Sequence, residues 1–180
     1  MQFAPTRIED VILVTPKLFG DPRGFFLEMY HQEKFQAGGI DAQFVQDNLS
    51  RSQRGVLRGL HYQIQHPQGK LVTVLSGKIF DVAVDVRRSS PTFGQWVGAI
   101  LDDESRQALY IPPGFAHGFS VLSDSADVYY KCTDLYHPEH ERTLLWNDPT
   151  VNVDWPLDSD PILSPKDVAG LPLDEVECFE

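Results

Sequence analysis

Residues 56–63 read VLRGLHYQ, and Gly69 and Lys70 follow after a short polar stretch. The segment is apolar and favours a β-strand, yet it places a guanidinium, an imidazole and an ammonium close together. Charged side chains are seldom buried without a partner or a role. We therefore predict that Arg58 holds an anionic group, His61 moves a proton and Lys70 faces an oxygen that becomes negative. The alternative is a half-exposed strand whose charged side chains point at water.

The spacing within this stretch makes a structural prediction. Arg58 and His61 are three residues apart, and a regular strand would point them to opposite faces. If both serve one site, Gly59 must lie at a bulge or kink of the strand.

Short segments with strand-like alternation or branching recur along the chain between turn signals. They cover residues 10–19, 25–30, 43–52, 70–75, 79–86, 95–101, 107–111, 117–122 and 126–133. Such regularly spaced short strands indicate a β-sandwich or barrel. We expect one all-β domain over residues 1–180, with a short helix over 31–37 and a Pro- and Asp-rich C-terminal extension that wraps the barrel as loops and a short helix.

Two local patterns carry alternatives. The polar run Gln46-Asp47-Asn48 suits a turn, which we expect, or a hydrogen-bonding ligand wall. Phe26 and Glu28 are two residues apart and would share a strand face, so an aromatic ring and a carboxylate could line one cavity. An exposed edge position is the alternative for Glu28.

Composition limits the partners of the chain. Fifteen Lys and Arg against 26 Asp and Glu give a net charge of −11, which argues against nucleic acid and anionic membranes as partners. No segment reaches the roughly 20 apolar residues of a membrane span, so we expect a soluble, cytoplasmic protein. Cys132 and Cys178 are too few for a disulfide framework and are expected to be ordinary thiols.

Motifs for covalent, nucleotide-dependent and metal-dependent chemistry are missing. The sequence has no Gly-x-Ser-x-Gly elbow and no Gly-x-Gly-x-x-Gly or phosphate loop, so no cofactor is expected. A barrel metal site usually has a His-x-His pair, whereas the corresponding residues here are His61-Tyr62-Gln63. We therefore predict no metal centre, and we expect His137 and His140 to lie on the surface.

Proton-transfer chemistry remains. His61 and Lys70 lie near one another in sequence, and Asp167 is a carboxylate later in the chain. A histidine paired with an aspartate is oriented and made more basic. A tyrosine could protonate the opposite face of a carbanion, but spacing alone does not choose between Tyr129 and Tyr130.

Ordered blocks of sequence carry a further signal, nearly end to end. They read FGDPRGFF (19–26), FVQDN (44–48), VLRGLH (56–61), GKLV (69–72), FDVAVD (80–85), SPTFGQW (90–96), IPPGFAHGF (111–119), YK (130–131), LWND (145–148) and LSPKD (163–167). In this order they resemble the dTDP-4-dehydrorhamnose 3,5-epimerase family. The resemblance implies a metal-free cupin jelly roll, a homodimer, and an isomerase that acts on a dTDP-4-keto-6-deoxy sugar in the synthesis of the L-rhamnose precursor.

The resemblance also assigns catalytic roles. His61 would be the general base, Asp167 the partner that orients it, and Lys70 the cation at the enolate oxygen. Tyr130, directly before Lys131, would be the general acid, which chooses between the two tyrosines.

A second group of residues matches positions that bind the nucleotide sugar. These are Phe19, Arg23, Phe26, Glu28, Gln46, Asp47, Asn48, Arg58, His117, Glu141 and Lys166. Arg23 and Arg58 would offset a diphosphate that the acidic protein as a whole repels. Asp81 resembles the partner of His117.

The implied chemistry agrees with these residue types. In a 4-keto sugar the protons on carbons 3 and 5 are both alpha to the carbonyl, so a base can remove each one if the enolate is stabilised. Reprotonation from the opposite face inverts the carbon, and no redox cofactor is needed. The expected reaction converts dTDP-4-dehydro-6-deoxy-D-glucose to dTDP-4-dehydro-L-rhamnose.

Three other functions are alternatives to this reaction. A relative that inverts only carbon 3 or carbon 5 of another dTDP-4-keto-deoxysugar would keep all of these residues and differ in pocket shape. A non-catalytic cupin that binds a nucleotide sugar would tolerate loss of His61 or Tyr130, and the presence of base, acid and lysine together argues against it. A metal-dependent cupin oxygenase would need the missing second histidine.

Overall fold

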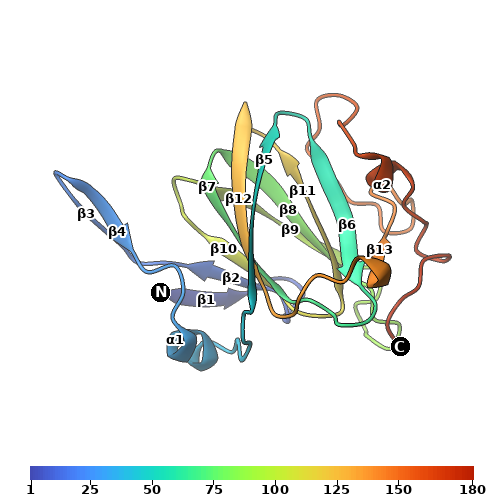
Figure 1. Ribbon diagram of the computed structural model, residues 1–180, viewed down its shortest axis with the longest axis horizontal. Helices are drawn as coiled ribbons and strands as arrows, with labels where there is room; N and C mark the ends of the chain where they lie inside the picture. The colour runs from blue at the N-terminus through green and yellow to red at the C-terminus, as the bar shows by residue number, and fades with distance from the viewer.

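The computed structural model describes residues 1–180 and is built almost entirely of antiparallel strands (Figure 1). One sheet has the order β1-β2-β10-β7-β12-β5, and a second has the order β13-β6-β11-β8-β9. The strands are β1 (Gln2–Pro5), β2 (Ile12–Thr15), β3 (Leu18–Asp21), β4 (Gly24–Leu27), β5 (Gln46–Gln53), β6 (Leu57–Gln63), β7 (Lys70–Ser76), β8 (Lys78–Asp85), β9 (Trp96–Asp102), β10 (Ala108–Ile111), β11 (Phe115–Val121), β12 (Ser125–Cys132) and β13 (Glu141–Thr143). The predicted all-β, cupin-type jelly roll is therefore confirmed.

Most predicted elements agree with the structure. From β6 to β12 every strand lies within two residues of its predicted ends. The predicted helix at 31–37 is α1 (Gln32–Ala37), and the C-terminal extension contains α2 (Pro165–Val168) after a short 3-10 turn, η1 (Pro138–His140). No helix of the structure is long and apolar enough to cross a membrane.

Two predictions about the N-terminal region were wrong. Gln46, Asp47 and Asn48 form the first part of β5 rather than a turn, because their backbone pairs in register with β12. The strand expected over residues 10–19 is divided between β2 and β3, and the division falls at Pro16, which has no N–H to donate to a sheet.

Two of the three hydrophobic clusters meet at the five-stranded sheet. On β8, Ile79 and Ala83 face the space between the two large sheets, whereas Val82 and Val84 pack under C-terminal residues 173–178. This alternation is the period of two expected for a strand buried on both faces. The C-terminal extension thus covers the outer face of the barrel, as predicted.

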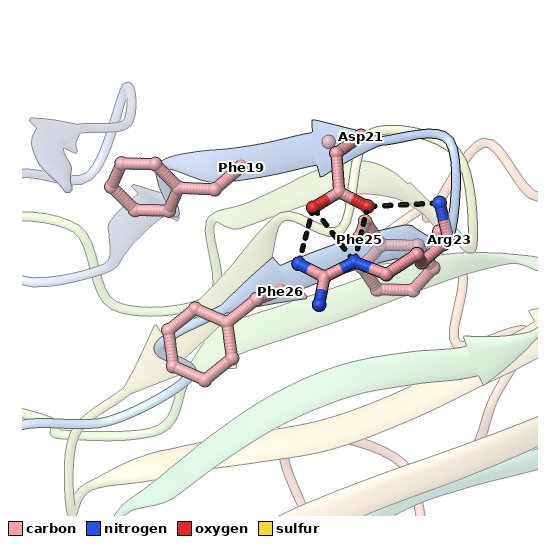
Figure 2. Close-up of a pocket in the computed structure, with 7 residues that line it drawn as sticks. Phe19, Asp21, Arg23, Phe25 and Phe26 are labelled. Carbon is pink, nitrogen blue, oxygen red and sulfur yellow. Dashed lines mark hydrogen bonds and ion pairs between the residues drawn. The ribbon is translucent and has the colours of Figure 1, made fainter.

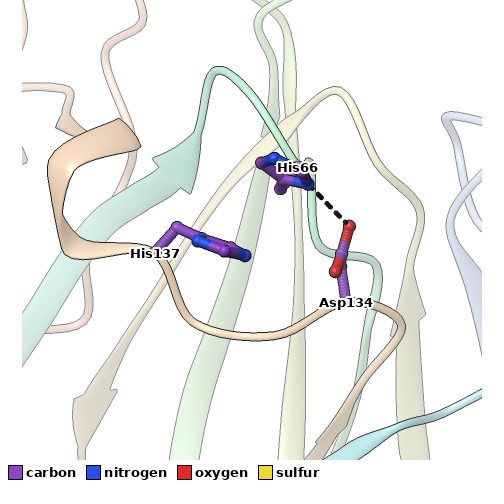
Figure 3. Close-up of side chains that lie close together, drawn as sticks. All are labelled: His66, Asp134 and His137. Atoms are coloured by element: carbon purple, nitrogen blue, oxygen red, sulfur yellow. Dashed lines mark ion pairs between the residues drawn. The ribbon is translucent and has the colours of Figure 1, made fainter.

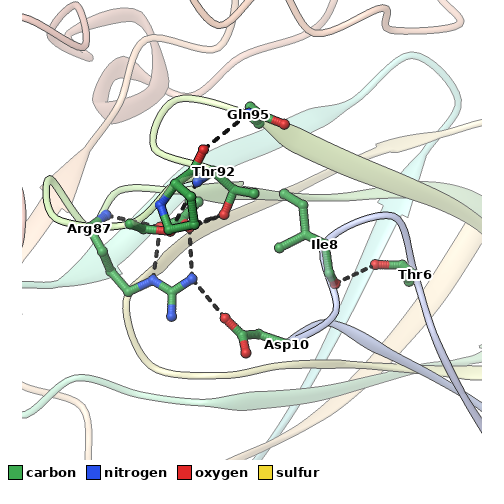
Figure 4. Close-up of polar contacts among 9 residues, drawn as sticks. Thr6, Ile8, Asp10, Arg87, Thr92 and Gln95 are labelled. Atoms are coloured by element: carbon green, nitrogen blue, oxygen red, sulfur yellow. Dashed lines mark hydrogen bonds and ion pairs between the residues drawn. The ribbon is translucent and has the colours of Figure 1, made fainter.

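A buried carboxylate fastens the turn after β8. Asp85 is fully buried and accepts hydrogen bonds from Arg87 (Nε, 2.9 Å), Ser90 (Oγ, 2.6 Å) and Thr92 (Oγ1, 2.6 Å). Burial opposes ionisation, but these bonds outweigh it and hold the pKa of Asp85 below its ordinary value. Arg87 also pairs with Asp10 at 2.8 Å, which ties the turn to the N-terminal segment (Figure 4).

One element stands apart from the barrel. Strands β3 and β4 form a separate two-stranded sheet that projects from one side, while the C-terminal segment covers the opposite side (Figure 1). Phe19 and Phe26 pair directly across this hairpin and are 52% and 69% exposed. Exposed aromatic rings in such a cluster are typical of interaction surfaces.

Candidate active site

A polar cavity of about 420 Å³ opens within the barrel. Its walls come from β5, β6, β7, β11 and β12 and from the C-terminal extension. It is lined by Gln46, Asn48, Ser50, Arg58, His61, Gln68, Lys70, His117, Phe119, Tyr130, Tyr136, Glu141, Ser164, Lys166 and Asp167. All four residues with predicted catalytic roles therefore meet in one place.

A bulge at Gly59 brings Arg58 and His61 to the same cavity, as their spacing required. The register of β6 against β11 shifts by one residue between the pairs that contain His61 and Arg58. Gly59 has φ +131°, and a Cβ added there would lie 2.5 Å from the Cα of Gly118. Only glycine fits this backbone conformation and this close approach.

His61 is held by a buried carboxylate. Its Nε2 lies 2.7 Å from Oδ1 of Asp167, whose side chain is almost fully buried. The same carboxylate accepts hydrogen bonds from the Gly59 N–H (3.2 Å) and from the Ser164 hydroxyl (2.6 Å). Ser164 and Asp167 form the capping box that starts α2, so a local helix signal fixes the position of the acid.

The protonation states of this pair suit a general base. Burial lowers the pKa of His61 below its ordinary value, and the hydrogen bond to Asp167 opposes the shift. Burial would raise the pKa of Asp167, but the hydrogen bonds from His61, Ser164 and Gly59 outweigh it and hold the carboxyl ionised. A neutral imidazole then donates its Nε2 proton to Asp167, and Nδ1 is free to accept a proton.

Only one of the two adjacent tyrosines lines the cavity. Tyr130 faces inward, and burial raises its pKa above the ordinary value, which keeps the phenol protonated. Tyr129 points to the other face of β12 and donates its hydroxyl to Asp47 at 2.9 Å. The placement agrees with Tyr130 as a proton donor.

Lys70 has no acidic partner in the structure. Its Nζ makes one hydrogen bond, at 3.4 Å, to the backbone oxygen of His61, and no carboxylate lies within ion-pair distance. Burial lowers the pKa of this ammonium below its ordinary value. A partly buried cation without a carboxylate partner is costly, so the arrangement indicates an anionic group supplied by a ligand.

Six of the predicted substrate-binding residues line the same cavity: Gln46, Asn48, Arg58, His117, Glu141 and Lys166. His117 is bound through Nε2 to the buried Asp81 at 2.8 Å, the pair that the resemblance suggested. Arg58 donates Nε to Ser52 at 2.9 Å and forms no ion pair, so its remaining N–H groups are available to an anion.

Glu141 is the second carboxylate of the cavity wall, beside Asp167. It accepts hydrogen bonds from Lys166 (2.8 Å) and from the hydroxyl of Tyr136 (3.2 Å). Tyr136 was missed in the sequence, as were Ser50, Gln68, Phe119 and Ser164. Ser50 had a usable signal, since Gln46, Asn48 and Ser50 alternate on one face once β5 is read as a strand.

Asp47 and Glu28 lie outside this cavity. Asp47 occupies the opposite face of β5, where it pairs with Lys131 at 2.7 Å. Glu28 follows the end of β4, so it does not share a strand face with Phe26, and it pairs with Lys34 at 2.6 Å.

Phe19, Arg23 and Phe26 also lie elsewhere, on the projecting hairpin. Figure 2 shows the two rings on the same side of the hairpin, with Arg23 turned toward Asp21 at 2.6 Å. They line a separate, open pocket of about 400 Å³ that contains only hairpin residues. Within one chain, the hairpin and the barrel cavity are thus two distinct surfaces.

Comparisons with known proteins agree with this geometry. Residues 5–175 match the family model described as dTDP-4-dehydrorhamnose 3,5-epimerase. The chain is 58% identical over 173 residues to the dTDP-4-dehydrorhamnose 3,5-epimerase of Pseudomonas aeruginosa, covering 96% of each chain.

Two solved structures are informative neighbours. A 3,5-epimerase from Legionella pneumophila in complex with dTDP-4-keto-L-rhamnose has a TM-score of 0.95 and 54% identity, with 98% of this chain and 94% of that chain covered. A 3'-monoepimerase from Streptomyces bikiniensis in complex with dTDP-quinovose has a TM-score of 0.89 and 37% identity, with 97% and 88% covered. Enzymes that invert one carbon and enzymes that invert two therefore share this fold.

Proposed function

The chain belongs to the dTDP-4-dehydrorhamnose 3,5-epimerase family, and we propose that it inverts carbons 3 and 5 of dTDP-4-dehydro-6-deoxy-D-glucose. The product is dTDP-4-dehydro-L-rhamnose, a precursor in dTDP-L-rhamnose biosynthesis, and the enzyme is an isomerase. One observation carries the proposal: His61, Tyr130 and the unpaired Lys70 line one cavity, with Asp167 bound to the imidazole.

Each inversion takes two proton transfers. Nδ1 of His61 removes the proton from carbon 3 or carbon 5, and the electron pair of the C–H bond moves to form an enolate whose negative oxygen faces Lys70. The phenol of Tyr130 then delivers a proton to the opposite face of the same carbon. The imidazolium and the phenolate return to their starting states by proton exchange with solvent.

Lys70 supplies the largest electrostatic contribution in this scheme. A donor fixed at a developing oxyanion contributes about 2.7–4 kcal/mol to the transition state in comparable sites. Because the ammonium has no carboxylate partner, its charge is fully available to the enolate.

The diphosphate of the substrate needs cationic side chains, and few of those in the cavity are free to bind it. Lys166 is already paired with Glu141, and Arg58 is the cavity arginine without an ion pair. The protein as a whole carries a net charge of −11, which repels a nucleotide diphosphate. Arg23, the other arginine that matches a substrate-binding position, lies on the hairpin.

We propose that the hairpin of a partner subunit completes each cavity in a homodimer. Support comes from the exposed Phe19 and Phe26 rings, which match aromatic positions near the nucleotide sugar and have no cover within the chain. A two-fold arrangement would place each hairpin over the other subunit's barrel.

The two free cysteines also fit a reducing compartment, and we propose a cytoplasmic location.

The reaction is tested by proton NMR of dTDP-4-dehydro-6-deoxy-D-glucose incubated with the enzyme in heavy water. Deuterium at carbons 3 and 5, with an L-rhamno product trapped by a reductase, is expected. Deuterium at one carbon only would identify a single-carbon epimerase, the activity named for the Streptomyces relative. No exchange with bound substrate would identify a binding protein.

The dimer is tested with two defective chains. His61→Ala has an inactive cavity and an intact hairpin, whereas the Arg23→Ala/Phe26→Ala double variant has an intact cavity and a defective hairpin. If the hairpin acts on the partner, mixing and refolding equal amounts restores about a quarter of the parental activity, because half of the dimers are mixed and each holds one complete site. If the hairpin serves its own chain, mixing restores nothing.

A further inference from the structure

Two loops at the rim of the cavity carry a cluster of potential metal ligands. The loop between β6 and β7 contributes His66, and the loop after β12 contributes Asp134 and His137. One ligand atom from each of the three lies within 4.8 Å of the other two. Figure 3 shows the two imidazole rings face to face, with the carboxylate beside His66.

The backbones that carry these side chains are held by one buried amide. Gln63 donates Nε2 to the backbone oxygen of His66 at 2.7 Å and accepts the His137 N–H at 2.7 Å. Gln68 donates its side-chain amide to the backbone oxygen of Asp134 at 2.8 Å. His66 has φ +53°, a conformation that few non-glycine residues adopt, and the Gln63 bond stabilises it. The backbones of all three residues are therefore held in place before any ion arrives.

The side chains of the cluster contact one another. The rings of His66 and His137 stack with centroids 4.4 Å apart, and Nδ1 of His66 lies 3.6 Å from Oδ2 of Asp134. Ligands of a tetrahedral zinc ion are about 3.3 Å apart, given metal–ligand distances near 2.0–2.2 Å. The contact between His66 and Asp134 is already close to that spacing, and the two stacked rings would turn so that each points one nitrogen at the ion.

The donor types select a class of ion. Two imidazoles and one carboxylate suit zinc, nickel, cobalt or copper, whereas calcium and magnesium prefer oxygen ligands. The ring of His140 lies 5.7 Å from that of His66 and is a third imidazole near the cluster. The side chain of His66 is about half exposed, which leaves room for coordinated water.

We propose that His66, Asp134 and His137 form a binding site for a divalent transition-metal ion of the zinc class. The ion would join the β6–β7 loop to the loop after β12, both of which contribute to the cavity wall through Gln68 and Tyr136. It lies outside the set of residues that carry out proton transfer, so its role is to stabilise the rim.

The proposal is tested by isothermal titration of tag-free, chelator-treated protein with zinc chloride. One equivalent of Zn²⁺ per chain is expected to bind, and Mg²⁺ at the same concentrations is not. His66→Gln and His137→Gln should each weaken Zn²⁺ binding at least about tenfold, because each removes a direct ligand. His31→Gln, which removes a histidine outside both the cluster and the cavity, should leave it unchanged.

A second measurement does not depend on the variants. Titration with paramagnetic Co²⁺ should broaden the imidazole NMR signals of His66 and His137 in the parental protein before those of His31. Zn²⁺ should also raise the unfolding temperature of the parental protein but not that of the His66→Gln/His137→Gln double variant. Zn²⁺ binding that persists in the double variant, or no saturable Zn²⁺ binding to the parental protein, would overturn the proposal.

Discussion

The barrel cavity and the β3–β4 hairpin contain residues predicted for the same substrate, yet they are built in opposite ways. In the cavity, His61, Asp167 and His117 are each fixed by hydrogen bonds to buried partners. On the hairpin, Phe19 and Phe26 are mostly exposed, and the pocket beside them is lined only by hairpin residues. The difference fits the proposed division of roles, in which the catalytic residues come from one chain and the hairpin of a partner subunit completes the binding of the nucleotide.

The largest expected effects come from truncating one side chain in the cavity and one on the hairpin, which should separate catalysis from substrate binding. His61→Ala removes the base and is expected to lower kcat by about 10²- to 10⁴-fold with little change in KM. Phe26→Ala removes a contact surface and should mainly raise KM. Steady-state kinetics of both variants checks this. Parental turnover by His61→Ala would remove it as the base, and an equal loss of kcat in Phe26→Ala would break the comparison.

The next effect concerns the unpaired cation of the cavity. Lys70→Met is expected to lower kcat by about 10²- to 10³-fold, because the enolate oxygen loses its fixed partner. Lys78→Met is the matched control, since Lys78 lies at the start of β8 and makes only a 3.9 Å ion pair with Asp102. Similar rates for both variants would show that the ammonium of Lys70 does not face the reacting oxygen.

Adjacent tyrosines on opposite faces of β12 offer a third test. Tyr130→Phe should still allow proton removal, seen as exchange of substrate hydrogen with heavy water, while inversion slows by about 10²-fold. Tyr129→Phe loses only its bond to Asp47 and should keep both rates. The ratio of exchange to inversion, measured by NMR, decides the case. If Tyr129→Phe were the slower enzyme, the acid would lie on the other face of the sheet.

Alanine substitution of two glycines with nearly the same φ angle compares the effect on stability in the cavity strand with that in the hairpin. Gly59 has φ +131° and meets Gly118 at 2.5 Å, whereas Gly24, at the hairpin turn, has φ +130° and open space around it. Both alanine variants incur backbone strain, but only Gly59→Ala adds overpacking, worth about 1–3 kcal/mol. Urea unfolding should show that difference. Equal losses would mean that the β6 bulge relaxes freely.

The sequence predicted the parts of this site that depend on local pattern. The bulge at Gly59 followed from two functional residues three positions apart, and the strands followed from alternation. Asp167 had no such signal, because it reaches His61 across 106 residues of sequence. Only the resemblance to a family connected them. The turn expected at Gln46 does not form, because pairing with β12 overrides the turn preference of three polar residues.

The smallest expected effect is a shift in the pH profile, and it tests how the cavity tunes its base. His61 must be neutral to accept a proton, so kcat/KM falls as the pH drops through the pKa of the free enzyme. Burial lowers that pKa below the ordinary 6.5, and the hydrogen bond to Asp167 opposes the shift. The acid limb should therefore have its midpoint below pH 6.5.

Asp167→Asn sharpens this prediction because it removes the carboxylate whose hydrogen bond and charge raise the pKa of His61. Its acid limb should lie at still lower pH than the parental one, although turnover also falls, since the imidazole loses its fixed orientation. Glu139→Gln, at an exposed carboxylate beside His137 and His140, should leave the limb in place. A midpoint that rises in Asp167→Asn would mean that the carboxylate does not stabilise the protonated base, and the cavity would need another explanation for the buried pair.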